Sequence, residues 1–98
     1  MSYDDTMKLS SKHHRTLQAI FEDPVRSDIA WADIETLLVA LGVELREGRG
    51  SRVRLRLNEI RAVFHRPHPQ KETDKGALKS MRRFLTEAGI GPEENNVC

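Results

Sequence analysis

An alternation of arginine and apolar residues in the middle of the chain constrains the fold more than any other feature of the sequence. Between Arg52 and Leu57 every second residue is Val or Leu, and the residues between them are arginines. A period of two is typical of a strand with one buried face and one solvent-facing face. We therefore predict a strand over this segment whose solvent face carries a row of arginines.

The residues that follow predict a hairpin. If Asn58 and Glu59 form a two-residue loop, the next strand begins at Ile60. This register places the apolar residues of both strands on one side, as the cross-strand pairs Leu57 with Ile60, Leu55 with Ala62, and Val53 with Phe64. It also places Arg56 opposite Arg61, and Arg52 opposite His65. Like charges directly opposite each other destabilise a ladder, so the register predicts that this face binds a polyanion.

The length of the chain and its single cysteine limit the class of protein that it can be. The chain has 98 residues, which predicts one small domain and argues against a large substrate cavity. Cys98, the last residue, has no partner within the chain, so we expect no disulfide and a reducing compartment. The sequence has no apolar run of about 18 residues, and its first eight residues do not resemble a secretion signal. We expect a cytoplasmic protein without a membrane segment.

The net charge of +1 conceals a strong asymmetry along the chain. Residues 46–83 hold twelve Lys or Arg residues against four Asp or Glu residues, a net charge of +8. Residues 1–45 carry a net charge of −4 and the last 15 residues a net charge of −3. A concentrated basic region is typical of phosphate binding. A solvated basic surface that maintains solubility is the alternative, and it fits arginines paired across one ladder less well.

The pattern divides the chain into two tails, residues 1–10 and 91–98, and one domain, residues 11–90. Within the domain we expect an N-terminal helix over residues 11–23, capped by Ser11 and ended before Pro24. A core over residues 31–90 follows. Its first helix has apolar residues at helical spacing from Trp31 to Leu41 and ends at Gly42.

We expect three strands and then one helix in the rest of the core. A strand over residues 43–47 precedes the arginine hairpin, and Pro67 and Pro69 end the sheet. A last helix begins at a cap on Thr73 or Asp74 and ends at Gly89. The order helix, helix, strand, strand, strand, helix predicts an α+β fold, in which helices cover one face of a three-stranded antiparallel sheet and the other face stays open.

Several segments of this core resemble the HicA toxins of bacterial and archaeal toxin–antitoxin pairs. They are the helix end Leu-Leu-Val-Ala-Leu-Gly-Val at residues 37–43, the pair Gly50-Ser51, and residues 78–90. The resemblance spans residues 31–90, so the N-terminal helix is an extension to it. It implies a fold like that of a double-stranded-RNA-binding domain (dsRBD-like), an mRNA-cleaving activity (an mRNA interferase) that halts translation, and neutralisation by a HicB antitoxin.

One position departs from the family. Members usually carry a histidine directly after the Gly-Ser pair, and that residue is held to be essential for RNA cleavage. Here the position is Arg52. Arginine does not deprotonate in proteins, so it cannot serve as a general base, and the catalytic role does not transfer to Arg52.

Two histidines are the candidates for catalysis. Cleavage of RNA without a metal needs a base for the ribose 2′-hydroxyl, an acid for the leaving 5′ oxygen, and cations for the charge on the phosphate. Histidine suits the first two roles because its pKa lies near neutrality. The predicted register sets His65 opposite Arg52, and His68 lies just beyond the strand. The structural alternatives are a strand-end cap for His65 and a rigid turn for His68.

The candidate RNA-binding residues are the basic side chains of the sheet and the segments after it: Arg52, Arg54, Arg56, Arg61, Arg66, Lys71 and Lys79. The planar guanidinium groups suit bidentate contacts with phosphate. The pair His65-x-x-His68 lacks the further ligands that a zinc site needs, so we expect no metal and no cofactor. Trp31 and Phe64 fall on apolar faces, which favours core packing over base stacking.

Three functions remain open at this point. The first is a HicA-type endoribonuclease toxin with mRNA and a HicB-like antitoxin as partners. The second is a non-catalytic dsRBD-like module that binds RNA by shape. The third is an antitoxin-docking protein whose complex with the antitoxin binds operator DNA.

Overall fold

Three helices and two antiparallel sheets make up the described part of the chain. The computed structural model describes residues 9–68 and 70–92. The elements are α2 (Ser11–Ile20), β1 (Ile29–Ala30), α3 (Trp31–Leu41), β2 (Glu44–Glu47), β3 (Arg52–Leu57), β4 (Ile60–His65), β5 (Glu72–Thr73) and α4 (Lys75–Glu87). The predicted α+β class is confirmed. Most of the two predicted tails, Cys98 included, and Pro69 lie outside the described residues.

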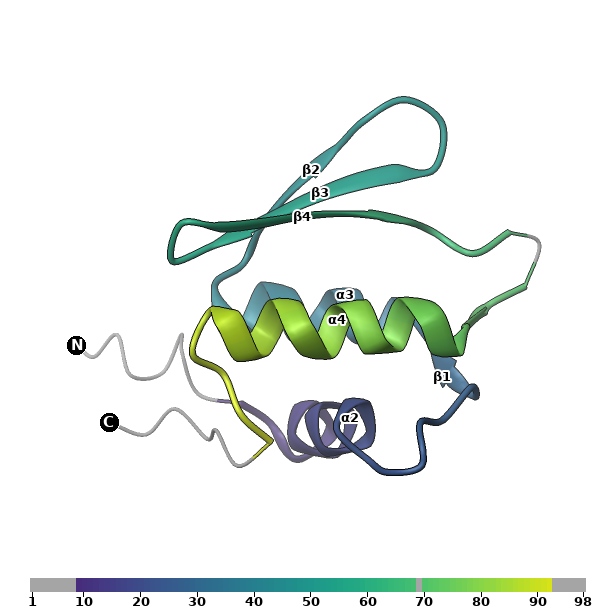
Figure 1. Cartoon of the computed structure of the whole chain (residues 1–98), viewed down its shortest axis with the longest axis vertical. Coiled ribbons are helices and arrows are strands. Elements are labelled where there is room, and N and C mark those ends of the chain that lie inside the picture. The colour runs from purple at the N-terminus through teal and green to yellow at the C-terminus, as the bar shows by residue number, and fades with distance from the viewer. Residues whose placement is uncertain (1–8, 69, 93–98) are drawn as a thin grey trace.

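The elements stack in layers. In Figure 1 the sheet β2-β3-β4 lies above α3 and α4, and α2 lies below these two helices. The helices therefore cover one face of the sheet, as predicted, and leave the other face open. The N-terminal helix adds a further layer on the side of α3 and α4 that is remote from the sheet.

The arginine hairpin has the predicted register. All six cross-strand pairs of β3 and β4 agree with it, from Leu57 with Ile60 at the loop to Arg52 with His65 at the far end. Asn58 and Glu59 have φ values of 51° and 68°, which is the left-handed geometry of a two-residue turn whose twist matches that of the strands. The Asn58 side-chain amide donates a hydrogen bond of 2.8 Å to the carbonyl oxygen of Ala88, so the hairpin loop is fixed to the end of α4.

The core lies between the sheet and the helices. Val53, Leu55 and Phe64 point inward from β3 and β4 and are buried. Trp31 is buried as well, and its ring centroid lies 6.0 Å from that of Phe64. Both aromatic residues therefore pack in the core, as predicted. The helices add the buried residues Ile34, Leu37, Leu38, Leu78, Met81, Phe84 and Leu85.

The helix ends follow ordinary capping chemistry. Gly42 ends α3 with a φ of 90°, a conformation that glycine adopts without steric cost. The Asp74 carboxylate caps α4 by accepting a 2.7 Å hydrogen bond from the backbone N–H of Ala77. This settles the choice between Thr73 and Asp74, because Thr73 is buried at the preceding position in β5.

The start of α2 differs from the prediction by one residue. The N-cap is Ser10, whose hydroxyl accepts a 3.1 Å hydrogen bond from the backbone N–H of His13. In return, Nδ1 of His13 accepts from the backbone N–H of Ser10. Histidine here takes the place that Glu or Gln has in a capping box, a substitution that the sequence pattern does not indicate. Leu9, which the sequence assigns to the tail, is buried in the core.

The end of α2 also differs, because the helix stops at Ile20 rather than at residue 23. A side chain of another helix contacts this end. The guanidinium group of Arg82, on α4, donates hydrogen bonds of 3.0 and 3.2 Å to the Ile20 carbonyl and one of 2.7 Å to the Glu22 carbonyl. These carbonyls lack partners within the helix, so Arg82 satisfies the end of α2 and fixes it to α4.

A second, two-stranded sheet joins two segments for which the sequence pattern predicts loops. Ile29 pairs with Thr73 and Ala30 with Glu72, and the backbone N–H of Trp31 donates to the Lys71 carbonyl at 3.0 Å. Strands of two residues are too short to show a period, which is why the sequence did not predict them. This small sheet holds the start of α3 beside the start of α4.

None of the helices in the described part of the chain is long and apolar enough to cross a bilayer.

Candidate nucleic-acid interface

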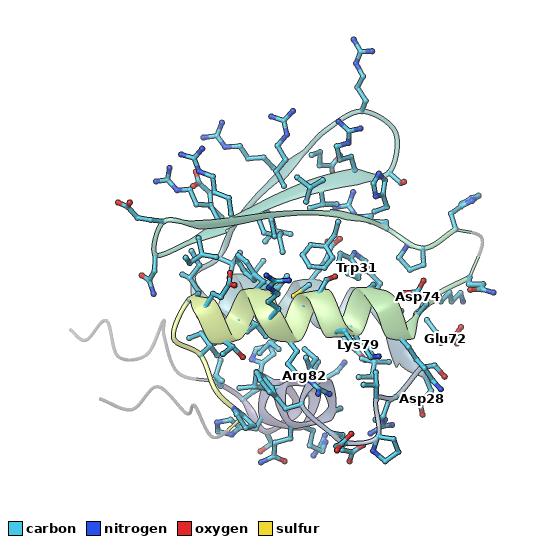
Figure 2. The ribbon with its side chains drawn as sticks, in the orientation of Figure 1. Asp28, Trp31, Glu72, Asp74, Lys79 and Arg82 are labelled. Atoms are coloured by element: carbon cyan, nitrogen blue, oxygen red, sulfur yellow. The ribbon has the colours of Figure 1, made fainter. Side chains whose placement is uncertain are left out.

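Five arginines lie on the open face of the main sheet. Arg52, Arg54 and Arg56 are exposed and alternate along β3 with inward-pointing apolar residues. Arg46 on β2 is the partner of Arg54, and Arg61 on β4 is the partner of Arg56. Figure 2 shows basic side chains projecting from the sheet on the side away from the helices. We refer to these five residues as the arginine face.

His65 lies at one end of this face. It is exposed at the end of β4, and its cross-strand partner is Arg52. Partners in an antiparallel pair share a face, so the imidazole and the guanidinium group project to the same side. Gly48 leaves room for the stem of Arg52: a Cβ atom on Gly48 would lie 3.3 Å from its Cδ. The structure thus brings His65 and Arg52 together as the predicted register requires.

Arg66 has a different environment from the other predicted RNA-binding arginines. Its Nε donates a 2.6 Å hydrogen bond to Glu35 on α3, and its Nη2 lies 3.4 Å from a carboxylate oxygen of Glu47. The indole N–H of Trp31 donates to the same Glu35 carboxylate. The backbone N–H of Arg66 also donates to the carbonyl of Ser51 at 2.9 Å. Arg66 therefore fastens the end of β4 to α3 and to the start of β3, next to His65.

The Glu35 carboxyl is held in its charged form. Partial burial raises its pKa, but hydrogen bonds from Arg66 and Trp31 and the charge of Arg66 outweigh this effect. The net result is a pKa of Glu35 below its ordinary value. A carboxyl group whose pKa falls on folding adds stability above its unfolded pKa of about 4.3, and this contribution is lost as the pH falls through the folded value.

Replacing Glu35 by glutamine should therefore lower the free energy of unfolding at pH 7 by about 1–2 kcal/mol, because it weakens hydrogen bonds to a charged group. The difference from the wild-type protein should shrink as the pH falls below the unfolded pKa of about 4.3 and through the lower folded pKa of Glu35. Urea unfolding at a series of pH values measures both effects. Glu87→Gln, at an exposed ion pair with Arg83, is the matched control, and an equal pH dependence in that variant contradicts the assignment.

The remaining predicted residues do not lie on the strands of the arginine face. His68 is exposed in the segment between β4 and β5. Lys71 is exposed directly before β5. Figure 2 places Lys79 on α4, in the helical layer below the sheet. The structure therefore groups His65 with Arg52, Arg54, Arg56 and Arg61, and separates the two lysines from them.

Glu44 and Arg46 of β2 are part of this surface, although the sequence pattern does not indicate them as site residues. Glu44 is the partner of Arg56, and its carboxylate oxygens lie 3.5 Å from Nε of Arg56 and 3.3 Å from Nη2 of Arg46. A pocket of about 380 Å³ opens here; its outward-facing lining consists of Glu44, Arg46, Arg54, Arg56, Arg61 and Val63. Only the register of β2 against β3 places Glu44 and Arg46 in this pocket, and the short β2 sequence alone does not fix that register.

Residues 9–68 and 70–92 contain no group of three or more His, Cys, Asp or Glu side chains that could hold a metal ion. The His65-x-x-His68 pair therefore has no third ligand of these types among them. The chemistry available on the arginine face is that of guanidinium groups, one imidazole and one carboxylate.

One protein-family model matches the sequence of this chain. The family model described as the HicA toxin of bacterial toxin–antitoxin systems matches residues 31–90, which is more than half of the chain and runs from the start of α3 past the end of α4. No curated protein and no solved structure matches the chain significantly. Because the matched segment contains the whole three-stranded sheet and the two helices beneath it, this chain belongs to the HicA toxin family.

Proposed function

We propose that this protein is an endoribonuclease that cleaves mRNA on the arginine face and is neutralised by a HicB-like antitoxin. Membership of the HicA family implies an antitoxin partner. The observation that carries the proposal is the pairing of His65 with Arg52 on an open, arginine-lined sheet. This arrangement offers a titratable imidazole next to a cation, although the family's usual histidine position holds an arginine.

The proposed reaction uses the ribose 2′-hydroxyl as nucleophile. His65 removes the 2′-hydroxyl proton, the 2′ oxygen bonds to phosphorus, and the bond from phosphorus to the 5′ oxygen breaks. The 5′ oxygen leaves with a proton from an acid, for which His68 is the candidate. The products are a 2′,3′-cyclic phosphate and a 5′-hydroxyl end. Arg52 stabilises the negative charge that develops on the phosphate oxygens.

The other arginines of the face position the RNA. Arg54, Arg56 and Arg61 are exposed and, unlike Arg66, project from the open sheet face, so they can contact the RNA. Arg66 acts instead through its contacts with Glu35 and Glu47, which hold the end of β4. Lys71 and Lys79 extend the basic surface outside this face.

Expression of the protein in a bacterial host tests the proposal. We expect growth arrest and loss of mRNA, relieved by co-expression of a HicB-like protein encoded by a neighbouring reading frame. Purified protein should yield RNA fragments with 5′-hydroxyl ends in the presence of EDTA. Intact RNA together with normal growth would contradict the proposal.

A non-catalytic RNA-binding module is the second candidate, and the observation that favours it is Arg52 at the usual histidine position. Such a module binds RNA but leaves it intact and does not arrest growth at modest expression. RNA cleavage therefore separates the two functions, whereas RNA binding supports both.

Replacing Arg61 by alanine should weaken RNA binding to a similar degree for all sequences, because it removes one phosphate contact. The slope of log K against log salt concentration should become shallower by about 0.7 for single-stranded RNA. Fluorescence anisotropy at several salt concentrations measures this slope. Arg15→Ala on α2, on the other side of the molecule, should leave it unchanged, and equal slopes for both variants would place the RNA elsewhere.

A further inference from the structure

The pocket on the arginine face contains a feature that phosphate binding does not explain. Glu44 lies among the arginines, between Arg46 and Arg56. A carboxylate repels phosphate, so a surface that only held an RNA backbone would gain nothing from it. The pocket lies at the hairpin end of the face, four residues along β3 from Arg52 and thus about 13 Å from the His65 end.

The ion pairs of Glu44 are long and exposed. They measure 3.3 and 3.5 Å, and the Glu44 side chain is 47% exposed. Pairs of this kind contribute little to stability and do not saturate the acceptor sites of the carboxylate. Both oxygens therefore remain open to a ligand that donates hydrogen bonds, in a pocket whose volume is at the lower end of the range for small-ligand sites.

We infer that this pocket binds a guanine base of single-stranded RNA, and that Glu44 reads its Watson–Crick edge; this rests on the proposed function in taking RNA as the ligand. Guanine presents two neighbouring donors on that edge, N1–H and the 2-amino group, which match the two acceptor oxygens of a carboxylate. On the same edge of adenine and cytosine, the amino group lies next to a ring nitrogen that accepts hydrogen bonds. In uracil the single N–H lies between two carbonyl groups. A carboxylate accepts only, so it favours guanine over the other three bases.

The rest of the pocket suits a base and its phosphates. Val63 is 56% exposed at the centre of the face, opposite Arg54, and offers an apolar surface for the base plane. The planar guanidinium group of Arg54 can stack on the same base. Arg56 and Arg61 lie beside it as a cross-strand pair for the flanking phosphates. Because the Watson–Crick edge must be free, the RNA is single-stranded at this position.

Binding of short oligonucleotides tests the inference. The probes are 2′-O-methyl pentamers with the sequences UUGUU, UUIUU and UUAUU, where I is inosine, which lacks the 2-amino group; they lack the 2′-hydroxyl and resist cleavage. We expect the wild-type protein to bind UUGUU about tenfold more tightly than UUIUU, in line with one lost hydrogen bond to a charged group, and UUAUU more weakly again. Glu44→Gln should bind the three probes within twofold of one another.

Glu22→Gln is the matched control, because it removes the same charge from an exposed ion pair with Arg26 on the α2 side of the molecule. It should keep the wild-type preference. Equal binding of the three probes by the wild-type protein, or an unchanged preference in Glu44→Gln, would overturn the inference. A third result would also overturn it: no guanine preference, together with a hexaglutamate peptide that competes with the probes more strongly on Glu44→Gln than on the wild-type protein. The pocket would then bind an acidic protein partner.

The same preparations are assayed for cleavage of unmodified RNA. Cleavage without guanine preference removes the inference and leaves the proposed function in place. Guanine preference without cleavage supports the inference and removes catalysis from the proposed function.

Discussion

Replacing His65 by alanine should lower the rate of RNA cleavage by about 10²–10⁴-fold, which is the usual contribution of one general acid or base. The affinity for RNA should change little, because the arginines that we propose to contact phosphate remain. His65 is exposed at the end of β4, so its truncation leaves the core intact. Single-turnover cleavage of a short RNA, together with growth after induction, measures the effect.

The matched control is His14→Ala, a histidine replacement on α2, on the other side of the molecule from the arginine face. It should cleave RNA at the wild-type rate. His68→Ala tests the candidate acid in the same assay. Undiminished cleavage by both His65→Ala and His68→Ala would remove histidine from the mechanism, provided that the thermal midpoints of the variants match that of the wild-type protein.

Replacing Leu17 by alanine should lower the free energy of unfolding by about 2–5 kcal/mol, the cost of truncating a fully buried leucine. Leu17 has no exposed surface, although α2 lies outside the segment that matches the family. The loss is a large fraction of the stability expected for a domain of this size. Denaturant unfolding followed by circular dichroism and by Trp31 fluorescence should give one common transition at a lower midpoint.

Gln18→Ala, at the exposed neighbouring position, should change the stability by less than about 0.5 kcal/mol. If α2 is a separate appendage, the two probes will report different transitions, and Leu17→Ala will leave the Trp31 transition unchanged. That result would also contradict the prediction that residues 11–90 fold as one domain.

The hairpin could be predicted in full because two independent constraints agree. The period of two fixes which residues of β3 are buried, and a one-residue slip would have turned Val53 and Leu55 outward. The two-residue loop at Asn58 and Glu59 then leaves one register for β4. The pairing of Arg52 with His65, on which the proposed catalytic site depends, follows from the same constraints.

Features that depend on distant partners could not be predicted. The contact of the Arg66 guanidinium group with Glu35, 31 residues away in sequence, is not visible in the local pattern. The end of α2 is capped by Arg82, 62 residues after Ile20. Glu44 joins the arginine face only through the β2–β3 register. In each case the local pattern identifies the charge, and only the tertiary fold identifies the partner.

Stacking α2 against α3 and α4, with the sheet on their opposite side, has an evolutionary consequence. The outward surface of α2 and the arginine face consist of different residues on opposite sides of α3 and α4, so each surface can be substituted separately. A lineage can therefore diversify the outward surface of α2 without changing any residue of the arginine face.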